Sequence, residues 1–139
     1  MFKKILLATD GSSHAIKAAE KAVGIAQQND DATVEIIYVV DATTVKNEVL
    51  HHWDALDIHE SRKNKFMQTE EMFEEAGISY KLRREYGDAG DKIVRIANDE
   101  GFDLVVVGSR GLNALQEMVL GSVSHKIAQR VESPVLIVK

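Results

Sequence analysis

The sequence predicts an α/β fold with an open parallel sheet and helices on both faces. Strand-like and helix-like stretches alternate along the whole chain, and this alternation is typical of parallel βαβ units. The run 104–107 is apolar at every position, as expected for a strand that is buried on both faces of such a sheet. No linker, repeat or low-complexity segment interrupts the alternation. We therefore expect a single domain over residues 1–139.

The expected elements follow from local patterns of apolar residues and turn residues. Five strands are expected, at residues 5–9, 34–40, 79–86, 104–107 and 134–138. Helices are expected to follow Ser12, Asp88 and Gly121, and a longer helix is expected to end at Ala76 with Gly77 as its C-cap. The first helix is expected to bury the face that carries Ile16, Ala19, Val23 and Ala26.

The third expected strand shows an alternation that indicates an edge position. Tyr80, Leu82 and Arg84 alternate with Lys81, Arg83 and Glu85, so one face of the strand is mainly apolar and the other is charged. A strand with one wet face is typical of the edge of a sheet. We therefore expect an edge strand with its charged residues on the wet face.

Composition and charge limit the classes of function. Apolar residues make up 45% of the chain and charged residues 28%, which is ordinary for a globular protein. No cysteine is present, so disulfides, thiol nucleophiles and cysteine metal sites are excluded. No apolar run reaches the roughly 18 residues of a membrane span, so we expect a cytoplasmic protein with no membrane partner. A net charge of −5 argues against a nucleic-acid partner.

A glycine-rich stretch after the fourth strand is the strongest candidate for a binding site. Gly108, Gly111 and Gly121 are spaced as Gly-x2-Gly-x9-Gly, and Ser122 follows the last glycine. Glycine lets the backbone approach an anion closely and adopt a positive φ. The first turn of the following helix adds free N–H groups and a favourable dipole, and Ser122 and Ser124 add hydroxyl donors. The carboxyl end of a central strand is also where open α/β sheets bind ligands.

This spacing differs from two other phosphate-binding motifs. Val123 follows Gly121-Ser122 where a Walker A loop has lysine, and the dinucleotide pattern Gly-x-Gly does not occur. Two glycines at a strand-to-helix turn also occur for structural reasons alone. An acidic chain needs local positive potential to bind a polyanion. Arg110, Lys126, backbone N–H groups and a bound divalent cation are the candidate sources.

Several stretches together resemble the universal stress protein family, in its ATP-binding subgroup. The glycine motif with Ser122 carries the resemblance, and so do the first strand and turn at 3–12, the end of the second strand at 38–41 and the last strand at 133–138. The resemblance covers nearly the whole chain and weakens between Thr43 and Gln68. It implies a Rossmann-like sheet of five parallel strands in the order 3-2-1-4-5.

The resemblance also implies an ATP-binding regulatory protein of a stress response. The triphosphate is then expected on the glycine motif and the first turn of the last helix, with Mg²⁺ or Mn²⁺ beside it. The adenine and ribose are expected against the first two strands, where the backbone of Val39 would recognise the adenine edge. The expected ligand-binding residues are Ala8, Asp10, Val39, Val107, Gly108, Gly111, Gly121, Ser122, Val123 and Ser124.

Other interpretations stay open on the sequence alone. Asp10 is either a ligand contact or a turn residue that caps the first helix. The chain is also compatible with a slow ATPase or other nucleotide-using enzyme, with AMP or cyclic AMP as the ligand, or with an interaction module that binds no nucleotide. No positioned base is evident, so no catalytic residue is expected. His51, His52 and His59 are expected at the surface and not at a metal, because neighbouring histidines do not share a helix face.

The last strand predicts a homodimer. Residues 134–138 are apolar, and in the implied order they lie at the sheet edge with no helix after them. Lys139 is the only charged residue expected at this edge, and an edge strand with few charges pairs readily with another strand. Two identical edges would pair antiparallel about a two-fold axis, centred on Leu136 and Ile137. The resemblance implies the same dimer, which we expect to form independently of ATP.

Overall fold

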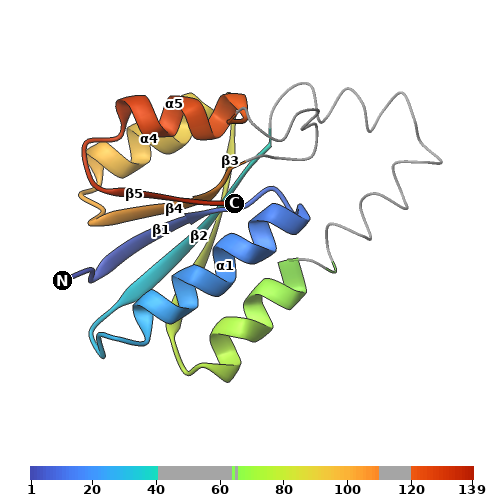
Figure 1. The fold of residues 1–139 in the computed structure, drawn as a ribbon, viewed down its shortest axis with the longest axis vertical. Helices are drawn as coiled ribbons and strands as arrows, with labels where there is room; N and C mark the ends of the chain where they lie inside the picture. Colours follow the sequence, from blue (N-terminus) through green and yellow to red (C-terminus); the bar gives the residue numbers. More distant parts are fainter. Residues whose placement is uncertain (41–63, 65, 110–119) are drawn as a thin grey trace.

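The computed structural model describes residues 1–40, 64, 66–109 and 120–139, and these residues form a five-stranded parallel sheet (Figure 1). The strands are β1 (Lys4–Ala8), β2 (Thr33–Val40), β3 (Ser79–Tyr86), β4 (Leu104–Gly108) and β5 (Val135–Val138). Their order in the sheet is β3-β2-β1-β4-β5, and every neighbouring pair is parallel. The predicted fold class and strand order are therefore confirmed.

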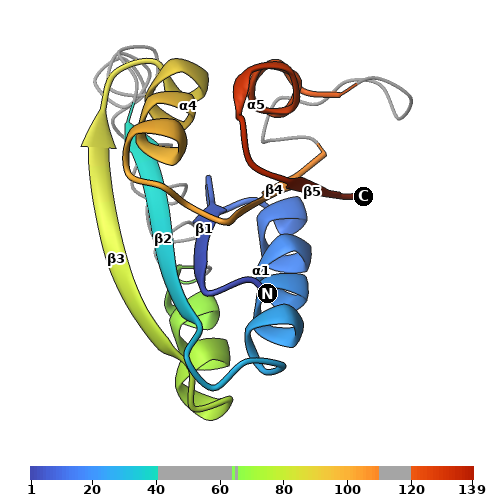
Figure 2. The same ribbon diagram turned by 90° about the vertical axis from the view of Figure 1, so that its left-hand side faces the viewer.

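Helices cover both faces of the sheet, as predicted (Figure 1, Figure 2). The helices are α1 (Ser13–Ala26), α4 (Ala89–Asp99) and α5 (Ser122–Arg130), with a further helical stretch at residues 66–75. α1 and the stretch at 66–75 lie on one face, whereas α4 and α5 lie on the other. Within the described ranges, no helix has the length and apolar character needed to cross a membrane.

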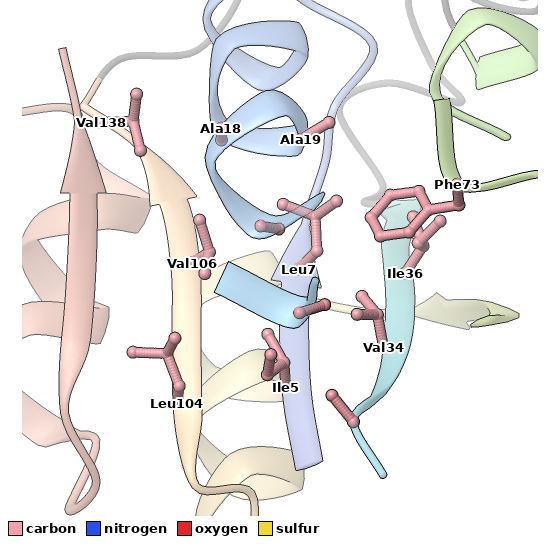
Figure 3. Packing of buried hydrophobic residues seen from close by; sticks show 13 residues of the cluster. Ile5, Leu7, Ala18, Ala19, Val34, Ile36, Phe73, Leu104, Val106 and Val138 are labelled. Carbon is pink, nitrogen blue, oxygen red and sulfur yellow. The ribbon is translucent and has the colours of Figure 1, made fainter. Parts of the chain in front are cut away.

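The two faces of β1 pack into separate hydrophobic cores. Ile5 and Leu7 belong to the core under α1, and Leu6 and Ala8 belong to the core under α4 and α5. Figure 3 shows the first core, to which the helical stretch at 66–75 contributes Phe73. β4 is likewise buried at every position, as its apolar run predicted. The two central strands therefore have no polar face.

α1 packs against the sheet through alanine. Its buried residues are Ala15, Ala18, Ala19, Ala22 and Ala26. The burial predicted for Ala19 and Ala26 is confirmed, but Ile16 and Val23 are only half-buried. The small alanine side chains let the helix lie close to the strands, and the larger side chains are consequently placed at the margin of the contact.

Glycine ends two of the helices. Gly77 follows the helical stretch at 66–75 with a φ of 70°, and the N–H of Ile78 donates to the carbonyl oxygen of Phe73 at 3.0 Å. Gly101 follows α4 in the same way with a φ of 69°. This left-handed backbone costs glycine little and lets the chain satisfy carbonyl groups at the end of each helix. The capping role predicted for Gly77 is therefore confirmed.

β3 has the predicted bounds and the predicted edge position, but its side chains are distributed differently from the prediction. Leu82, expected on the inner apolar face, is 60% exposed. Arg83, expected on the wet face, is half-buried and pairs with Glu100 and Glu85 at 2.8 Å each and with Glu35 at 3.7 Å. Glu100 and then Glu85 raise the pKa of the Arg83 guanidinium. The alternation in the sequence does not reveal these carboxylates, because Glu35 and Glu100 come from other parts of the chain.

Asp103 holds the start of β1 against β4. One oxygen of its carboxylate accepts the N–H groups of Lys4 at 2.9 Å and Lys3 at 3.1 Å. The N–H of Asp103 in turn donates to the carbonyl oxygen of Lys4 at 2.7 Å. The N–H groups of Lys4 and Lys3 lower the pKa of the Asp103 carboxyl. These bonds fix the two central strands at their amino ends, opposite the candidate site described below.

Gly24 offers a test of the helical backbone of α1. It is exposed in the last turn of this helix, and a Cβ added there would meet no atom within 4 Å. We expect Gly24→Ala to raise the free energy of unfolding by about 0.5–1 kcal/mol, because alanine loses less backbone entropy than glycine in a helix. Urea denaturation followed by circular dichroism measures this change.

Gly77→Ala is the matched control. Its added Cβ would also meet open space, but the backbone φ is positive. This variant is expected to lose about 1–2 kcal/mol because alanine disfavours the left-handed conformation. Two variants that shift stability in the same direction would contradict the described backbone.

Candidate functional site

The carboxyl ends of β1 and β4 lie side by side at the centre of the sheet and form the candidate site. β1 pairs with β2 on one side and with β4 on the other, and β4 also pairs with β5. β1 leads into α1 on one face of the sheet, whereas the chain after β4 leads to α5 on the other face (Figure 1). This is the switch point at which open α/β sheets bind ligands.

The structure places most of the predicted site residues at this end of the sheet. Ala8 ends β1 and Asp10 follows it, Val39 lies one residue before the end of β2, Val107 and Gly108 end β4, and Gly121, Ser122, Val123 and Ser124 begin α5. Gly111 lies outside the described residues, as do Arg110, His51, His52 and His59. The backbone and side chains around β4 and α5 show how these positions are held.

The backbone of Ser109 joins three elements at the site. Its N–H donates to the carbonyl oxygen of Val138 at 2.8 Å, which ties the end of β4 to β5. Its carbonyl oxygen accepts the N–H of Gly121 and the hydroxyl of Ser124, both at 2.9 Å. Ser109 is buried, so these polar groups have no access to water as an alternative. The start of α5 is consequently fixed against the end of β4.

The first turn of α5 presents backbone N–H groups without acceptors. Gly121 is the N-cap residue, and it provides no side-chain hydrogen bond to the helix. The first backbone bond of the helix runs from the N–H of His125 to Gly121, at 2.9 Å. Among the described residues, the N–H groups of Ser122, Val123 and Ser124 have no acceptor. Three free N–H groups at the positive end of a helix dipole favour an anion.

The two serine hydroxyls of this turn differ in availability. Ser124 is buried, and its Oγ lies 2.9 Å from the carbonyl oxygen of Ser109 and 3.0 Å from that of Gly121. A hydroxyl has one proton, so Ser124 has none left to donate to an anion. Ser122 is exposed and no hydrogen bond of its hydroxyl occurs within the described structure. Of the two predicted hydroxyl donors, only Ser122 is therefore free to serve.

Asp10 holds the turn between β1 and α1. Its Oδ1 accepts the N–H of Ser12 at 2.9 Å. Ser12 is the residue that caps α1, since its Oγ accepts the N–H of Ala15 at 3.2 Å. The capping interpretation of Asp10 is therefore wrong, although Asp10 orients the cap. The turn also contains Gly11, whose φ of 76° brings the chain sharply around from the strand into the helix.

Gly108 and Gly121 do not have the backbone conformation that we expected of them. Neither has a positive φ, and at Gly121 φ is −62° and ψ is 159°. At Gly108, an added Cβ would lie 3.1 Å from both the Cβ and the carbonyl oxygen of His14 in the first turn of α1. Glycine suits position 108 because α1 packs directly on the end of β4, and a side chain there would require His14 to shift by a few tenths of an ångström. This role was not predictable from the sequence, because His14 and Gly108 are far apart in the chain.

His14 is a residue at the site that the sequence did not single out. Its side chain is half-buried, and its Nδ1 atom is buried with no hydrogen-bond partner in the described structure. Its backbone lies against Gly108, so the imidazole belongs to the same end of the sheet. A histidine in the first turn of a helix has no distinctive sequence pattern, which is why the prediction missed it.

Three predicted contacts have side chains that belong to the core. Ala8 and Val107 are buried in the cluster under α4 and α5, and the half-buried Val39 packs against the same cluster. Their side chains are thus occupied by packing. A ligand at this end of the sheet would meet these residues chiefly through their backbone groups, as the resemblance implied for Val39.

Lys126 does not serve as a free positive charge. Its Nζ lies 3.0 Å from Asp91 and 3.3 Å from Asp88, both on the α4 side. Asp91 first and Asp88 second raise the pKa of Lys126 by hydrogen bonding. Gly90 permits this approach, because an added Cβ there would lie 2.7 Å from the Lys126 Cδ. Among the described residues, the candidate source of positive potential that remains is therefore the set of backbone N–H groups at the start of α5.

The whole chain, residues 1–139, matches the family described as the universal stress protein family. It is similar to the universal stress protein YxiE of Bacillus subtilis, with 35% identity over an alignment that covers all of both chains. Among solved structures it is similar to the hypothetical protein MJ0577, with a TM-score of 0.80 and 32% identity over all of this chain and 96% of the other.

Adenine nucleotides are bound in other structures of the same fold. A universal stress protein in complex with cAMP has a TM-score of 0.70 and 24% identity, over 99% of this chain and 97% of the other. A universal stress protein of Archaeoglobus fulgidus is in complex with dAMP, and a family member from Arabidopsis thaliana has AMP bound. Their TM-scores are 0.71 and 0.64, at 17% and 22% identity, over 99% of this chain and 98% and 91% of theirs. At this identity the likeness concerns the fold.

Ser124→Ala tests how the start of α5 is held. The variant removes the hydroxyl that donates to Ser109, and we expect the free energy of unfolding to fall by about 1 kcal/mol. Ser122→Ala is the matched control in the same turn of α5. We expect it to change stability little because the Ser122 side chain is exposed. Urea denaturation of both variants makes the comparison. Equal effects in the two variants would mean that the buried hydroxyl does not anchor the helix.

Proposed function

The chain belongs to the universal stress protein family, and from this premise we propose that it binds ATP as a regulatory protein of a stress response. The observation that carries the proposal is the set of N–H groups without acceptors in the first turn of α5, held in place by Ser109. They lie at the switch point of the sheet, where the fold accommodates a ligand. The adenine nucleotides bound to neighbours of the same fold support the choice of ligand class.

The proposed triphosphate site is built mainly from backbone. The N–H groups of Ser122, Val123 and Ser124 would bind phosphate oxygens, and the Ser122 hydroxyl would add one further donor. Gly121 keeps side-chain atoms away from these groups, and Gly108 and Gly111 complete the proposed phosphate-binding set. Backbone donors carry no net charge, so this arrangement suits an acidic chain.

The nucleoside would lie toward β1 and β2. We assign the adenine edge to the backbone of Val39 and the ribose to Asp10, with Ala8 and Val107 beneath them. Asp10 Oδ1 already accepts the N–H of Ser12, so its carboxylate has a fixed position from which to accept a hydroxyl. A base read by backbone groups gives preference for adenine over guanine, because the two bases present different donors and acceptors at that edge.

A divalent cation, Mg²⁺ or Mn²⁺, would accompany the phosphates. The described residues contain no group of three acidic, histidine or cysteine side chains that could hold a metal ion. The phosphate oxygens would therefore supply most of the ligands, with Asp10 as the carboxylate at this end of the sheet. Mg²⁺ is commonly held in this manner, through one or two carboxylates, substrate phosphates and water.

Binding without rapid turnover is the function that these residues fit best. Hydrolysis requires a group that orients the attacking water or accepts its proton. Asp10 is assigned to the ribose and the cation and already accepts the N–H of Ser12, and His125 is exposed on α5. The imidazole of His14 lies at the same end of the sheet, but within the described structure no hydrogen-bond partner orients its Nδ1. We therefore propose a regulatory binder and expect hydrolysis far slower than the typical 1–10³ s⁻¹ of enzymes.

Thermal unfolding in the presence of nucleotides tests the proposed function. ATP with Mg²⁺ is expected to stabilise the wild type by about 2.7 kcal/mol at a hundredfold excess over Kd, and GTP is expected to stabilise it less. AMP and cyclic AMP at the same concentrations distinguish recognition of the triphosphate from recognition of adenosine. A melting temperature that none of the adenine nucleotides changes at millimolar concentration would contradict the proposal.

Gly121→Val makes the same measurement specific to the site. The branched side chain would stand beside the free N–H groups, and we expect it to abolish stabilisation by ATP while the chain still folds. Gly24→Val, at an exposed position in the last turn of α1, controls for the change from glycine to valine. It is expected to lower the baseline melting temperature and leave the shift caused by ATP intact.

We also infer that the protein forms a homodimer through β5. This strand lies at the edge of the sheet, and its inner side pairs with β4. The carbonyl oxygens of Pro134 and Val138 accept bonds from the β4 side, so alternation along the strand turns the backbone groups of Val135 and Ile137 outward. The backbone groups of Leu136, which we expected at the centre of the dimer ladder, therefore point toward β4. Val135 and Ile137 supply the free groups for an antiparallel pair.

Light scattering tests this dimer. We expect the mass of a dimer for the wild type at tens of micromolar, both with and without ATP. Ile137→Pro removes an outward N–H and retains the inward bonds to β4, so it is expected to give a folded monomer. A wild type that is monomeric, or a variant that stays dimeric, would mean that β5 does not form the interface.

A further inference from the structure

β3 is the other edge of the sheet, and its outward backbone groups can be assigned. Figure 2 shows β3 as the outermost strand beside β2. The N–H of Gly87, directly after the strand, donates to the carbonyl oxygen of Val40 at 3.0 Å. Successive residues of a strand point their backbone groups to alternate sides. The N–H and C=O groups of Tyr80, Leu82, Arg84 and Tyr86 consequently point away from β2.

The side chains on this edge include an exposed apolar pair that flanks a cation. Leu82 and Tyr86 are 60% and 65% exposed. Residues two apart share one face of a strand, so Arg84 lies between them on that face. The guanidinium carbon of Arg84 lies 6.0 Å from the centre of the Tyr86 ring. The strand therefore presents an apolar, a cationic and an aromatic side chain in a row.

Two positive charges of β3 are available to a partner. Arg83 is committed to the cluster with Glu35, Glu85 and Glu100. Lys81 and Arg84 are exposed, and neither makes an ion pair with any residue in the described parts of the chain. On a chain with a net charge of −5, two free cations on one exposed strand are a local exception.

We propose that the edge of β3 binds an extended acidic segment of a partner protein by strand addition. Opposite residues on one face of paired strands interact directly. The complementary segment therefore has an acidic residue opposite Arg84 and apolar residues two positions to either side of it, opposite Leu82 and Tyr86. This apolar–x–acidic–x–apolar pattern reads the same in both chain directions, so it fits parallel and antiparallel addition alike. Backbone bonds to the four outward residues supply the affinity and the side chains supply the selectivity.

A second copy of the same strand fits this edge poorly. Antiparallel pairing about a two-fold axis centred on Lys81, Arg83 or Arg84 places that cation opposite its own copy. Centring the pair on Leu82 places Lys81 opposite Arg83. Like charges directly opposite each other are destabilising, which favours a partner with the opposite charge.

Peptide binding to the full chain tests the proposal. The probe is a short, terminally blocked, fluorescent peptide with the core sequence Thr-Val-Thr-Glu-Thr-Val-Thr. The control probe carries lysine in place of the glutamate. Fluorescence anisotropy is expected to show saturable binding of the glutamate peptide and no binding of the lysine peptide at the same concentrations.

Charge reversal on the protein completes the test. Arg84→Glu is expected to weaken binding of the glutamate peptide roughly tenfold, since a favourable cross-strand pair becomes a repulsive one. Lys21→Glu makes the same change at an exposed lysine of α1 and is expected to leave binding unchanged. Arg84→Pro, which removes an outward N–H, is expected to abolish binding. Circular dichroism verifies that each variant folds. If the proline variant does not fold, the affinity of Arg84→Glu for the glutamate peptide decides between the expected and the contrary result.

Four results would overturn the proposal. The first is that the glutamate peptide does not bind at millimolar concentration, and the second is that the lysine peptide binds as tightly as the glutamate peptide. The third is that Lys21→Glu weakens binding as much as Arg84→Glu does. The fourth is that the wild type self-associates and that Arg84→Glu strengthens this association or Arg84→Pro abolishes it. The last result would assign the edge of β3 to a second copy of the chain.

Discussion

The backbone hydrogen bonds of one buried residue, Ser109, are the constraint on which the candidate site depends. They join the end of β4 to β5 through Val138 and to the start of α5 through Gly121 and Ser124. Leaving any of these buried groups unpaired would cost free energy, so the three elements are held in one arrangement. The free N–H groups of α5 are consequently positioned before a ligand arrives. Such preorganisation lowers the cost of ordering groups on binding.

Close packing of α1 is the second requirement of this arrangement. The alanine face of α1 lets the helix lie near the strands, and Gly108 lets its first turn rest on the end of β4. A side chain at Gly108 would crowd His14 in that first turn. The glycines of the motif thus serve different purposes: Gly108 meets the packing of the protein itself, whereas Gly121 leaves the first turn of α5 uncovered. Glycines that belong to one sequence motif therefore need not share one role.

Much of the fold was predictable because its determinants are local. The apolar run at 104–107 identified a strand buried on both faces, and Gly77 marked the end of a helix. The strand order came from the family resemblance and not from periodicity. The ion pairs of Arg83 and the pairing of Lys126 with α4 were not predictable, because they join residues that only the tertiary fold brings together. Ser109 was missed for another reason, since backbone hydrogen bonds leave no pattern in the side chains.

The two edge strands, β5 and β3, differ in how they connect to the candidate site. In β5, alternation sends the carbonyl oxygen of Val138 inward to Ser109 and the backbone groups of Ile137 outward, so an added strand and the site use different atoms of the same strand. Pairing at β5 therefore need not compete with the bonds that hold α5. β3 is separated from β1 by β2, and its outward groups make no bond to those residues of the site that the structure describes. Linkage between a nucleotide and a partner requires that each alter the other's binding free energy. Val39 of β2, the proposed adenine contact, pairs with Glu85 of β3, so the register of these two strands provides one direct connection between the proposed nucleotide site and this edge.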